Sequence, residues 1–240
     1  MENSKKVVNV IIEELRALAD EKKAKEMTKY FKTGYGEYAH NDVFLGVVTQ
    51  KIRDIAKKHF AKANLSQAAY LLKSKYHEIR RAGIEILVFK MSKEYDETKR
   101  QKIATCYLNN IDGVNNWDLV DASAPQILGA FLNDKDKSIL YEFAVSDNLW
   151  KQRIAIISTL HFIRKGNFED TLAIIEMVMD SKHDLIHKAI GWMLREVGKR
   201  DFETELKFLD KYAPTMPRTA LRYALERFDE DLREYYMHVE

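Results

Sequence analysis

Trp117 and Asp121 stand four residues apart in the segment NNWDLVD. Residues at this spacing share one face of a helix, so an aromatic ring and a carboxylate can meet a ligand at the same place. The ring could hold a sugar or a cationic base, and the carboxylate could stabilise positive charge that develops on a substrate. Asp118 points to a rotated face, where it could cap the helix or balance charge without a functional role.

Two further residues could serve the same chemistry. Trp192 offers a second aromatic ring in KAIGWMLRE, and Arg153, in WKQRIAI, could hold a phosphate group through its planar guanidinium. Each residue alone also has an ordinary structural explanation. A single tryptophan at helical spacing is more often part of a core, which is the interpretation we adopt for Trp150. A single aspartate near a helix start is more often a cap.

Basic residues recur at a nearly constant interval. The positions are Arg81, Arg153, Lys188 and Arg222, with gaps of 72, 35 and 34 residues, and the midpoint of the first gap is Trp117. A period of about 35 residues is typical of two-helix solenoid repeats. Equivalent positions of stacked repeats lie on one face, so these cations are predicted to form a row that contacts a DNA phosphate backbone. The alternative is that each is an ordinary solvated residue.

Helical periodicity extends along the whole chain, and no segment alternates in the manner of a strand. With only three prolines and nine glycines, the composition also favours helix. The sequence therefore predicts one all-α domain over 1–240, an α-solenoid of HEAT-like helix pairs with a concave basic groove. The expected helices cover roughly 4–20, 21–32, 42–58, 65–73, 77–92, 97–109, 117–132, 137–145, 148–164, 169–180, 184–198, 202–211 and 216–237, the last one broken near Phe228.

The remaining composition excludes several classes of protein. No apolar stretch is long enough to span a bilayer, and the N-terminal segment carries internal charges, unlike a signal peptide. The single cysteine, Cys106, is expected to be a buried apolar residue in a reducing compartment, which predicts a cytoplasmic protein. Neither metal-ligand spacing nor a nucleotide-binding motif is present, so we expect no metal and no cofactor. The net charge of +2 does not by itself indicate a nucleic-acid partner.

Three segments together resemble a known family. NNWDLVD, SDNLWKQRIAI and HKAIGWMLRE look like the signature segments of the AlkD-type DNA alkylation-repair glycosylases, which are built from HEAT-like repeats. KAKEMTKYFK, followed by FLGV, resembles the opening helices of that family, and APTMPRTALRYALERF resembles its closing repeat. The similarity extends from about Lys22 to Phe228. Asn116 stands where many members have a second aromatic residue, a difference expected to weaken substrate stacking.

The resemblance implies an activity and site roles. Members hydrolyse the N-glycosidic bond of cationic N-alkylated purines in duplex DNA, of the 3-methyladenine and 7-methylguanine types, without flipping the base into a pocket. By resemblance, Asp121 opposes the charge on the sugar and positions water. Trp117 and Trp192 flank the deoxyribose, Arg153 holds backbone phosphate, and Tyr30 lies near the lesion. We therefore expect a monomer that acts on double-stranded DNA containing alkylated bases. We expect no association with a membrane.

Two other functions remain open. A non-catalytic solenoid that recognises damaged or bent DNA would use the same basic residues without needing Asp121. A protein-interaction scaffold is the commonest use of helical repeats, and for it the tryptophans and aspartates would be incidental. Dependence of duplex binding on salt would separate both DNA-binding functions from the scaffold.

Overall fold

The structure is a computed structural model that describes residues 2–239, with side chains placed over 6–239. It is all-α, as predicted, and the described chain contains no strand beyond an isolated parallel bridge between Val43 and Tyr76. The chain divides into two compact units, one ending at Ile127 and the other beginning at Leu128. The predicted single domain and its continuous concave groove therefore stay predictions.

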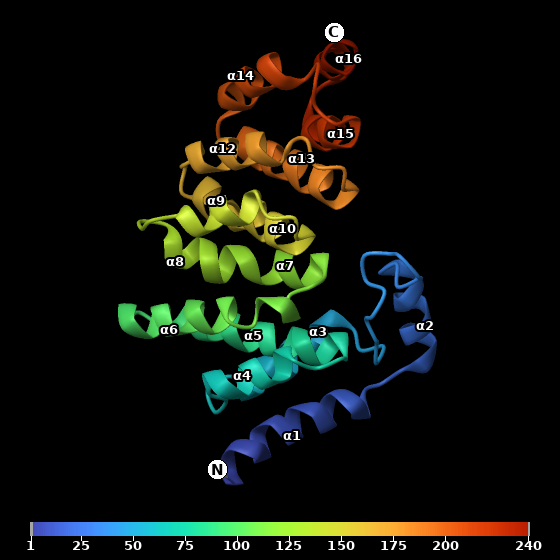
Figure 1. Cartoon of the computed structure of the whole chain (residues 1–240), viewed down its shortest axis with the longest axis vertical. Helices are drawn as coiled ribbons and strands as arrows, with labels where there is room; N and C mark the ends of the chain where they lie inside the picture. The colour runs from blue at the N-terminus through green and yellow to red at the C-terminus, as the bar shows by residue number, and fades with distance from the viewer. Residues whose placement is uncertain (1, 240) are drawn as a thin grey trace. The chain divides into compact units, whose positions relative to one another are not determined.

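The first unit is a stack of helices centred on α5 (Figure 1). Its helices are α1 (Glu2–Ala17), α2 (Glu21–Tyr30), α3 (Thr49–His59), α4 (Leu65–Leu72), α5 (His77–Lys93), α6 (Glu97–Leu108) and α7 (Trp117–Ala124). Helix α5 packs against α3, α4, α6 and α7. Its Gly83 permits a close approach to α4, because a Cβ there would lie 2.9 Å from the carbonyl oxygen of Ala68.

The second unit is organised around α13, which packs against α10, α12, α14 and α15. Its helices are α8 (Ala130–Leu132), α9 (Ser138–Ala144), α10 (Leu149–Ser158), α11 (Leu160–Arg164), α12 (Glu169–Val178), α13 (Asp184–Gly198), α14 (Phe202–Tyr212), α15 (Arg218–Ala224) and α16 (Glu230–His238). Gly191 lets α13 contact α15 closely, since a Cβ there would lie 2.2 Å from the carbonyl oxygen of Ala220.

Most expected helix boundaries are confirmed to within a few residues, and the differences have local causes. The helix expected over 42–58 begins only at Thr49, because the backbone of 45–47 is bound by a carboxylate instead of forming a helix. The helix expected over 117–132 changes to a π-helix at Pro125–Gly129. The break near Phe228 is confirmed by a 3-10 turn at Leu225–Arg227. Within the described residues, none of the helices has both the length and the apolar character needed to cross a membrane.

Candidate functional site

Trp117, the first residue of α7, is part of an aromatic cluster in the first unit. Its ring stacks on Phe31, with centroids 5.4 Å apart and planes at 18°, and Phe31 stacks in turn on Phe44. Tyr30 meets Trp117 edge-on, at 6.0 Å between centroids, and is 67% exposed. Phe31 and Phe44 are buried, whereas Trp117 is half-buried. One face of Trp117 therefore packs against the protein, while part of the ring stays accessible beside Tyr30.

A buried carboxylate holds the segment that carries part of this cluster. Glu78 accepts hydrogen bonds from the backbone N–H groups of Leu45, Gly46 and Val47, at 2.8 to 3.2 Å. Gly46 has a φ of +84°, and a Cβ at this position would lie 2.1 Å from the carbonyl oxygen of Asp20. Only glycine fits such an approach. The loop is thereby fixed between α5 and the start of α2, the helix that ends at Tyr30.

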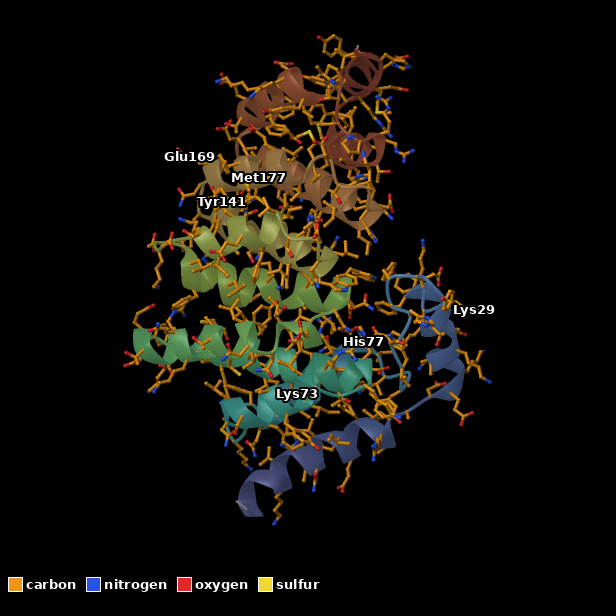
Figure 2. The ribbon with its side chains drawn as sticks, in the orientation of Figure 1. Lys29, Lys73, His77, Tyr141, Glu169 and Met177 are labelled. Carbon is orange, nitrogen blue, oxygen red and sulfur yellow. The ribbon has the colours of Figure 1, made fainter. Side chains whose placement is uncertain are left out.

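His77, the first residue of α5, is labelled in Figure 2; it is 3% exposed, and its ring lies against Phe31 and Phe44 of the aromatic cluster. Its Nδ1 is 3.1 Å from a carboxylate oxygen of Asp42, and its Nε2 is 2.9 Å from one of Asp118. Its ring also stacks on Phe44. Burial alone would lower the pKa of His77, but the two carboxylates outweigh it and raise the pKa to about 8. His77 is therefore a cation at neutral pH, with each ring nitrogen donating to a carboxylate.

Asp42 connects this imidazolium to two further groups. It accepts from Nη2 of Arg80 at 2.5 Å and from the side-chain amide of Asn116 at 2.8 Å. Burial would raise the pKa of Asp42, but the His77, Arg80 and Asn116 contacts outweigh it and lower the pKa. Asp42 is thus an ionised carboxylate with three donors. The sequence does not reveal this network, because nothing in the pattern around Asp42 indicates that the fold brings it to His77.

Asn116 is buried, and the expectation that it weakens substrate stacking stays a prediction. Its side chain is 0% exposed, so it cannot be part of a surface that stacks on substrate. Its Oδ1 accepts from the backbone N–H of Trp117 at 2.8 Å, and its Nδ2 donates to Asp42. Asn116 is the cap that begins α7 and ties this helix to the His77 network. Asn116, which replaces the aromatic residue of the family pattern, therefore supports the backbone at Trp117.

Arg81, predicted to contact DNA phosphate, is engaged inside the first unit. Arg81 is 8% exposed, and its Nε and Nη2 donate to Glu85 within α5. Its Nη1 donates to the carboxylate and to the backbone carbonyl of Asp118. Since every guanidinium nitrogen has a partner inside the first unit, Arg81 holds α5 and α7 together. The same contacts confirm that Asp118 balances charge.

Arg153, in the second unit, shows why the basic residues keep a common register. It is 5% exposed, and its Nη1 donates to the backbone carbonyl of Leu185, the second residue of α13. Arg81 binds the carbonyl of Asp118, which is the second residue of α7. Both arginines thus bind the start of a helix one repeat further along the chain. Burial and hydrogen bonding between repeats explain the common register at these two positions, and phosphate contact by Arg153 stays a prediction.

The other predicted cations are more accessible. Nζ of Lys188 lies 2.7 Å from a carboxylate oxygen of Asp184 on the same helix, α13. Arg222, on α15, is exposed and lies near the hydroxyl of Thr219, at 3.4 Å. Trp192 is half-buried on α13. Trp150, expected in the core, is half-buried too, at the start of α10.

Asp121 lies one turn after Trp117 on α7 and is half-buried. Its charge acts on Tyr107, whose hydroxyl forms a 2.9 Å hydrogen bond with that of Ser123. Burial raises the pKa of Tyr107, the Ser123 contact opposes that effect, and the negative charge of Asp121 raises the pKa further. Tyr107 therefore stays a neutral phenol close to the carboxylate. Across the described residues, we find no cluster of histidine, cysteine or acidic side chains suited to a metal ion.

Comparisons with known proteins agree with this architecture. A solved structure, a predicted DNA alkylation repair enzyme from Enterococcus faecalis, is similar in fold, with a TM-score of 0.70 and 18% identity over 88% of this chain and 97% of that chain. A search among curated protein sequences found no match. The family model for DNA alkylation repair enzymes matches residues 11–228, which is nearly the whole chain. The chain therefore belongs to the DNA alkylation repair enzyme family.

Proposed function

We propose that the protein is a DNA glycosylase that hydrolyses the N-glycosidic bond of cationic N-alkylated purines in duplex DNA. The observation that carries the proposal is the accessible part of Trp117, which lies beside exposed Tyr30, with Asp121 one turn later on the same helix. A family role in repair of alkylated DNA supports it. The 3-methyladenine and 7-methylguanine types are the substrates that suit this chemistry.

The chemistry requires little from the protein beyond electrostatics. An alkylated purine that already carries positive charge is a good leaving group, so its departure needs no strong general acid. The sugar develops oxocarbenium-like charge as the bond breaks, and a nearby carboxylate stabilises that charge. We assign this role to Asp121, together with the orientation of the attacking water. The rings of Trp117 and Tyr30 offer surfaces for the deoxyribose and the damaged nucleotide.

The contacts around Trp117 favour a rigid site. The indole is supported by the Phe31 stack, and the start of its helix is fixed by the Asn116 cap and by the Asp118 contacts to His77 and Arg81. A preorganised group stabilises a transition state without reorganising during the reaction. These residues are positioning residues, because they support Trp117 and the helix that carries Asp121.

The roles proposed for the second unit rest on the family resemblance. We assign Trp192 to the opposite side of the deoxyribose, and Arg153, Lys188 and Arg222 to contacts with backbone phosphate. Lys188 and Arg222 are accessible for such contacts, whereas Arg153 would combine phosphate binding with its hydrogen bond to Leu185. We further propose that the protein acts as a monomer and needs no cofactor.

Release of free base tests the function directly. The protein is incubated with methylated duplex DNA, and the released bases are separated by chromatography. We expect 3-methyladenine and 7-methylguanine to appear faster than in a matched incubation without protein, which measures spontaneous depurination. Release at the spontaneous rate, from DNA that the protein demonstrably binds, would replace the glycosylase by a non-catalytic binder of damaged DNA.

A further inference from the structure

A pocket of about 450 Å³, whose lining residues are mostly polar or charged, opens in the first unit beside the His77 network. Two walls come from the loop between α4 and α5 and the loop between α6 and α7, and the segment before α3 and Arg80 of α5 complete the lining. The cationic residues that line it are Lys73, Lys75 and Arg80, and the acidic ones are Asp42 and Asp112. Four asparagines, Asn41, Asn109, Asn110 and Asn115, also line it, and side-chain amides can donate hydrogen bonds to a ligand.

The two walls are held together by specific contacts. A Cβ on Gly113 would lie 2.2 Å from the backbone carbonyl oxygen of Leu72, so only glycine permits this approach of the loops. Nη1 of Arg80 donates to the carbonyls of Ser74 and Lys75, at 3.0 and 3.3 Å, which fixes the loop that carries both lysines. The pocket is therefore formed before any ligand binds.

Its charges favour an anion. Lys73 and Lys75 are exposed at the pocket, and Lys73 is visible in Figure 2. Arg80 is 4% exposed, and its buried Nε has no hydrogen-bond partner among the described residues. Asp42 is engaged by Arg80, His77 and Asn116, so its charge is largely balanced. Asp112 is exposed and is the acidic group that opposes an anion here.

The pocket is next to the proposed site. Asp42 belongs both to the pocket lining and to the network beneath Trp117. Asn115, another lining residue, is two positions before Trp117. We propose that this pocket binds a phosphodiester of the DNA strand that passes Trp117, the contact that buried Arg81 cannot make. The inference rests on the proposed function, since it assigns a backbone contact to the same DNA-binding surface.

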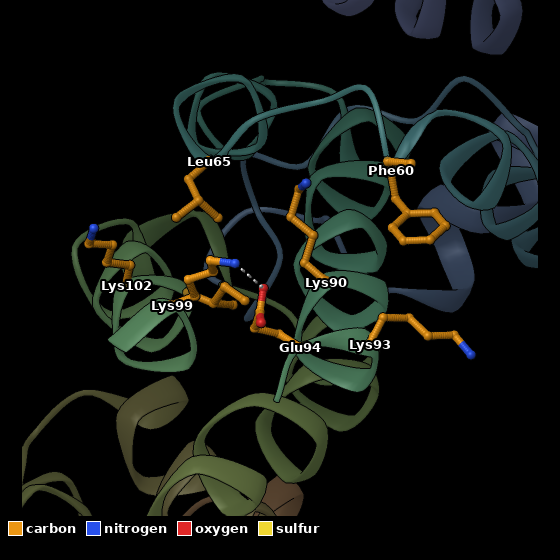
Figure 3. Close-up of a pocket in the computed structure, with 9 residues that line it drawn as sticks. Phe60, Leu65, Lys90, Lys93, Glu94, Lys99 and Lys102 are labelled. Carbon is orange, nitrogen blue, oxygen red and sulfur yellow. Dashed lines mark ion pairs between the residues drawn. The ribbon is translucent and has the colours of Figure 1, made fainter. Parts of the chain in front are cut away.

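A second pocket in the first unit provides a matched control (Figure 3). It has a volume of about 300 Å³, and its lining includes four lysines, Lys90, Lys93, Lys99 and Lys102, with the apolar residues Phe60, Leu65 and Ile103. Two of its lysines, Lys90 and Lys93, lie in the last turn of α5, whereas His77 begins that helix. Its Lys99 is paired with Glu94 at 3.9 Å. Lys93 and Lys102 are exposed, as are Lys73 and Lys75. Replacing either pair by alanine changes the net charge by the same amount, but Lys93 and Lys102 lie away from the proposed site.

The test compares two double variants in binding to an undamaged, fluorescently labelled duplex over a range of chloride concentrations. The salt slope is the slope of the logarithm of duplex affinity against the logarithm of salt concentration. Lys73→Ala with Lys75→Ala should weaken binding and flatten this slope by about two units, because about one unit is lost for each phosphate contact. Lys93→Ala with Lys102→Ala should leave the slope unchanged. Asp112→Asn, which removes the opposing charge, should tighten binding. Equal slopes in wild type and the Lys73/Lys75 variant, or equal losses in both double variants, would overturn the proposal.

Two further measurements test which ligand the pocket binds and whether the proposed function holds. Inorganic phosphate should displace the duplex more strongly than chloride at equal ionic strength, and this excess should disappear in the Lys73/Lys75 variant. Phosphate that binds without any effect of the lysines on duplex affinity would overturn the assignment to DNA. In base release, the variant should lose rate at limiting protein and recover it at saturating protein. Duplex binding that depends on these lysines without any base release would leave the pocket standing and reject the glycosylase.

Discussion

The imidazole Nε2 of His77 lies 2.9 Å from a carboxylate oxygen of Asp118, which joins the start of α5 to the start of α7. The same oxygen of Asp118 is 3.3 Å from Nη1 of Arg81. Two cations on α5 therefore hold one carboxylate on the helix that begins with Trp117. This arrangement makes the support of Trp117 dependent on the charge of a histidine.

His77→Gln should reduce stability in a pH-dependent manner. The pKa of His77 rises from 6.5 to about 8 on folding, so protonated His77 stabilises the protein fully below about pH 6.5 and loses this effect as pH rises through about 8. That rise in pKa corresponds to about 2 kcal/mol of folding free energy. The stability advantage of wild type over the variant should therefore be larger at low pH than at high pH by about this amount. Urea unfolding at several pH values measures the difference. A gap between the two proteins that stays constant from pH 6 to about 9 would show that His77 does not titrate as described.

Asn116→Ala should destabilise the first unit by about 1–3 kcal/mol, because it removes the cap of α7 and leaves Asp42 without one of its donors. Asn64→Ala removes a cap elsewhere in the same unit, at α4, and serves as the comparison. Thermal unfolding gives both losses. If Asn116→Ala changed base release or lesion preference at unchanged stability, Asn116 would be a substrate contact after all.

Much of the helical framework could be predicted because periodicity and caps are local properties. Asn64, Asp96 and Asn148 each cap a helix close to the position where the apolar pattern begins. The spacing of Trp117 and Asp121 was enough to place them one turn apart on one helix. The common register of the basic residues is visible in the sequence and requires a reason.

The nature of that reason could not be predicted. Whether Arg81 and Arg153 face solvent depends on the residues that the fold brings to them, namely Asp118 and Leu185, and a single sequence does not reveal such pairs. The sequence does not reveal the role of His77 for the same reason, since its two carboxylates are 35 and 41 positions away along the chain. Pairing between distant polar groups converted expected surface residues into buried ones.

Arg153→Ala and Arg222→Ala should differ in their effect on stability. Arg153 is buried and donates to the Leu185 carbonyl, so its loss should destabilise the second unit by roughly 1–3 kcal/mol. Arg222 is exposed, so its loss should leave stability within about 0.5 kcal/mol and flatten the salt slope of duplex binding by about one unit. Urea unfolding and salt titrations of both variants provide the measurements. A stable Arg153→Ala protein would show that the contact to α13 contributes little.

Asp121→Asn should slow release of 7-methylguanine by roughly 10²-fold or more while duplex affinity holds steady or rises slightly. The substitution keeps the shape of the side chain and removes a charge that acts mainly on the transition state, when the sugar becomes cationic. Single-turnover release at saturating protein, measured beside a binding titration, separates these two effects. Asp118→Asn is the informative comparison, because Asp118 binds His77 and Arg81 and its loss should lower stability more than the rate. Equal release rates for wild type and Asp121→Asn would reject Asp121 as the catalytic carboxylate.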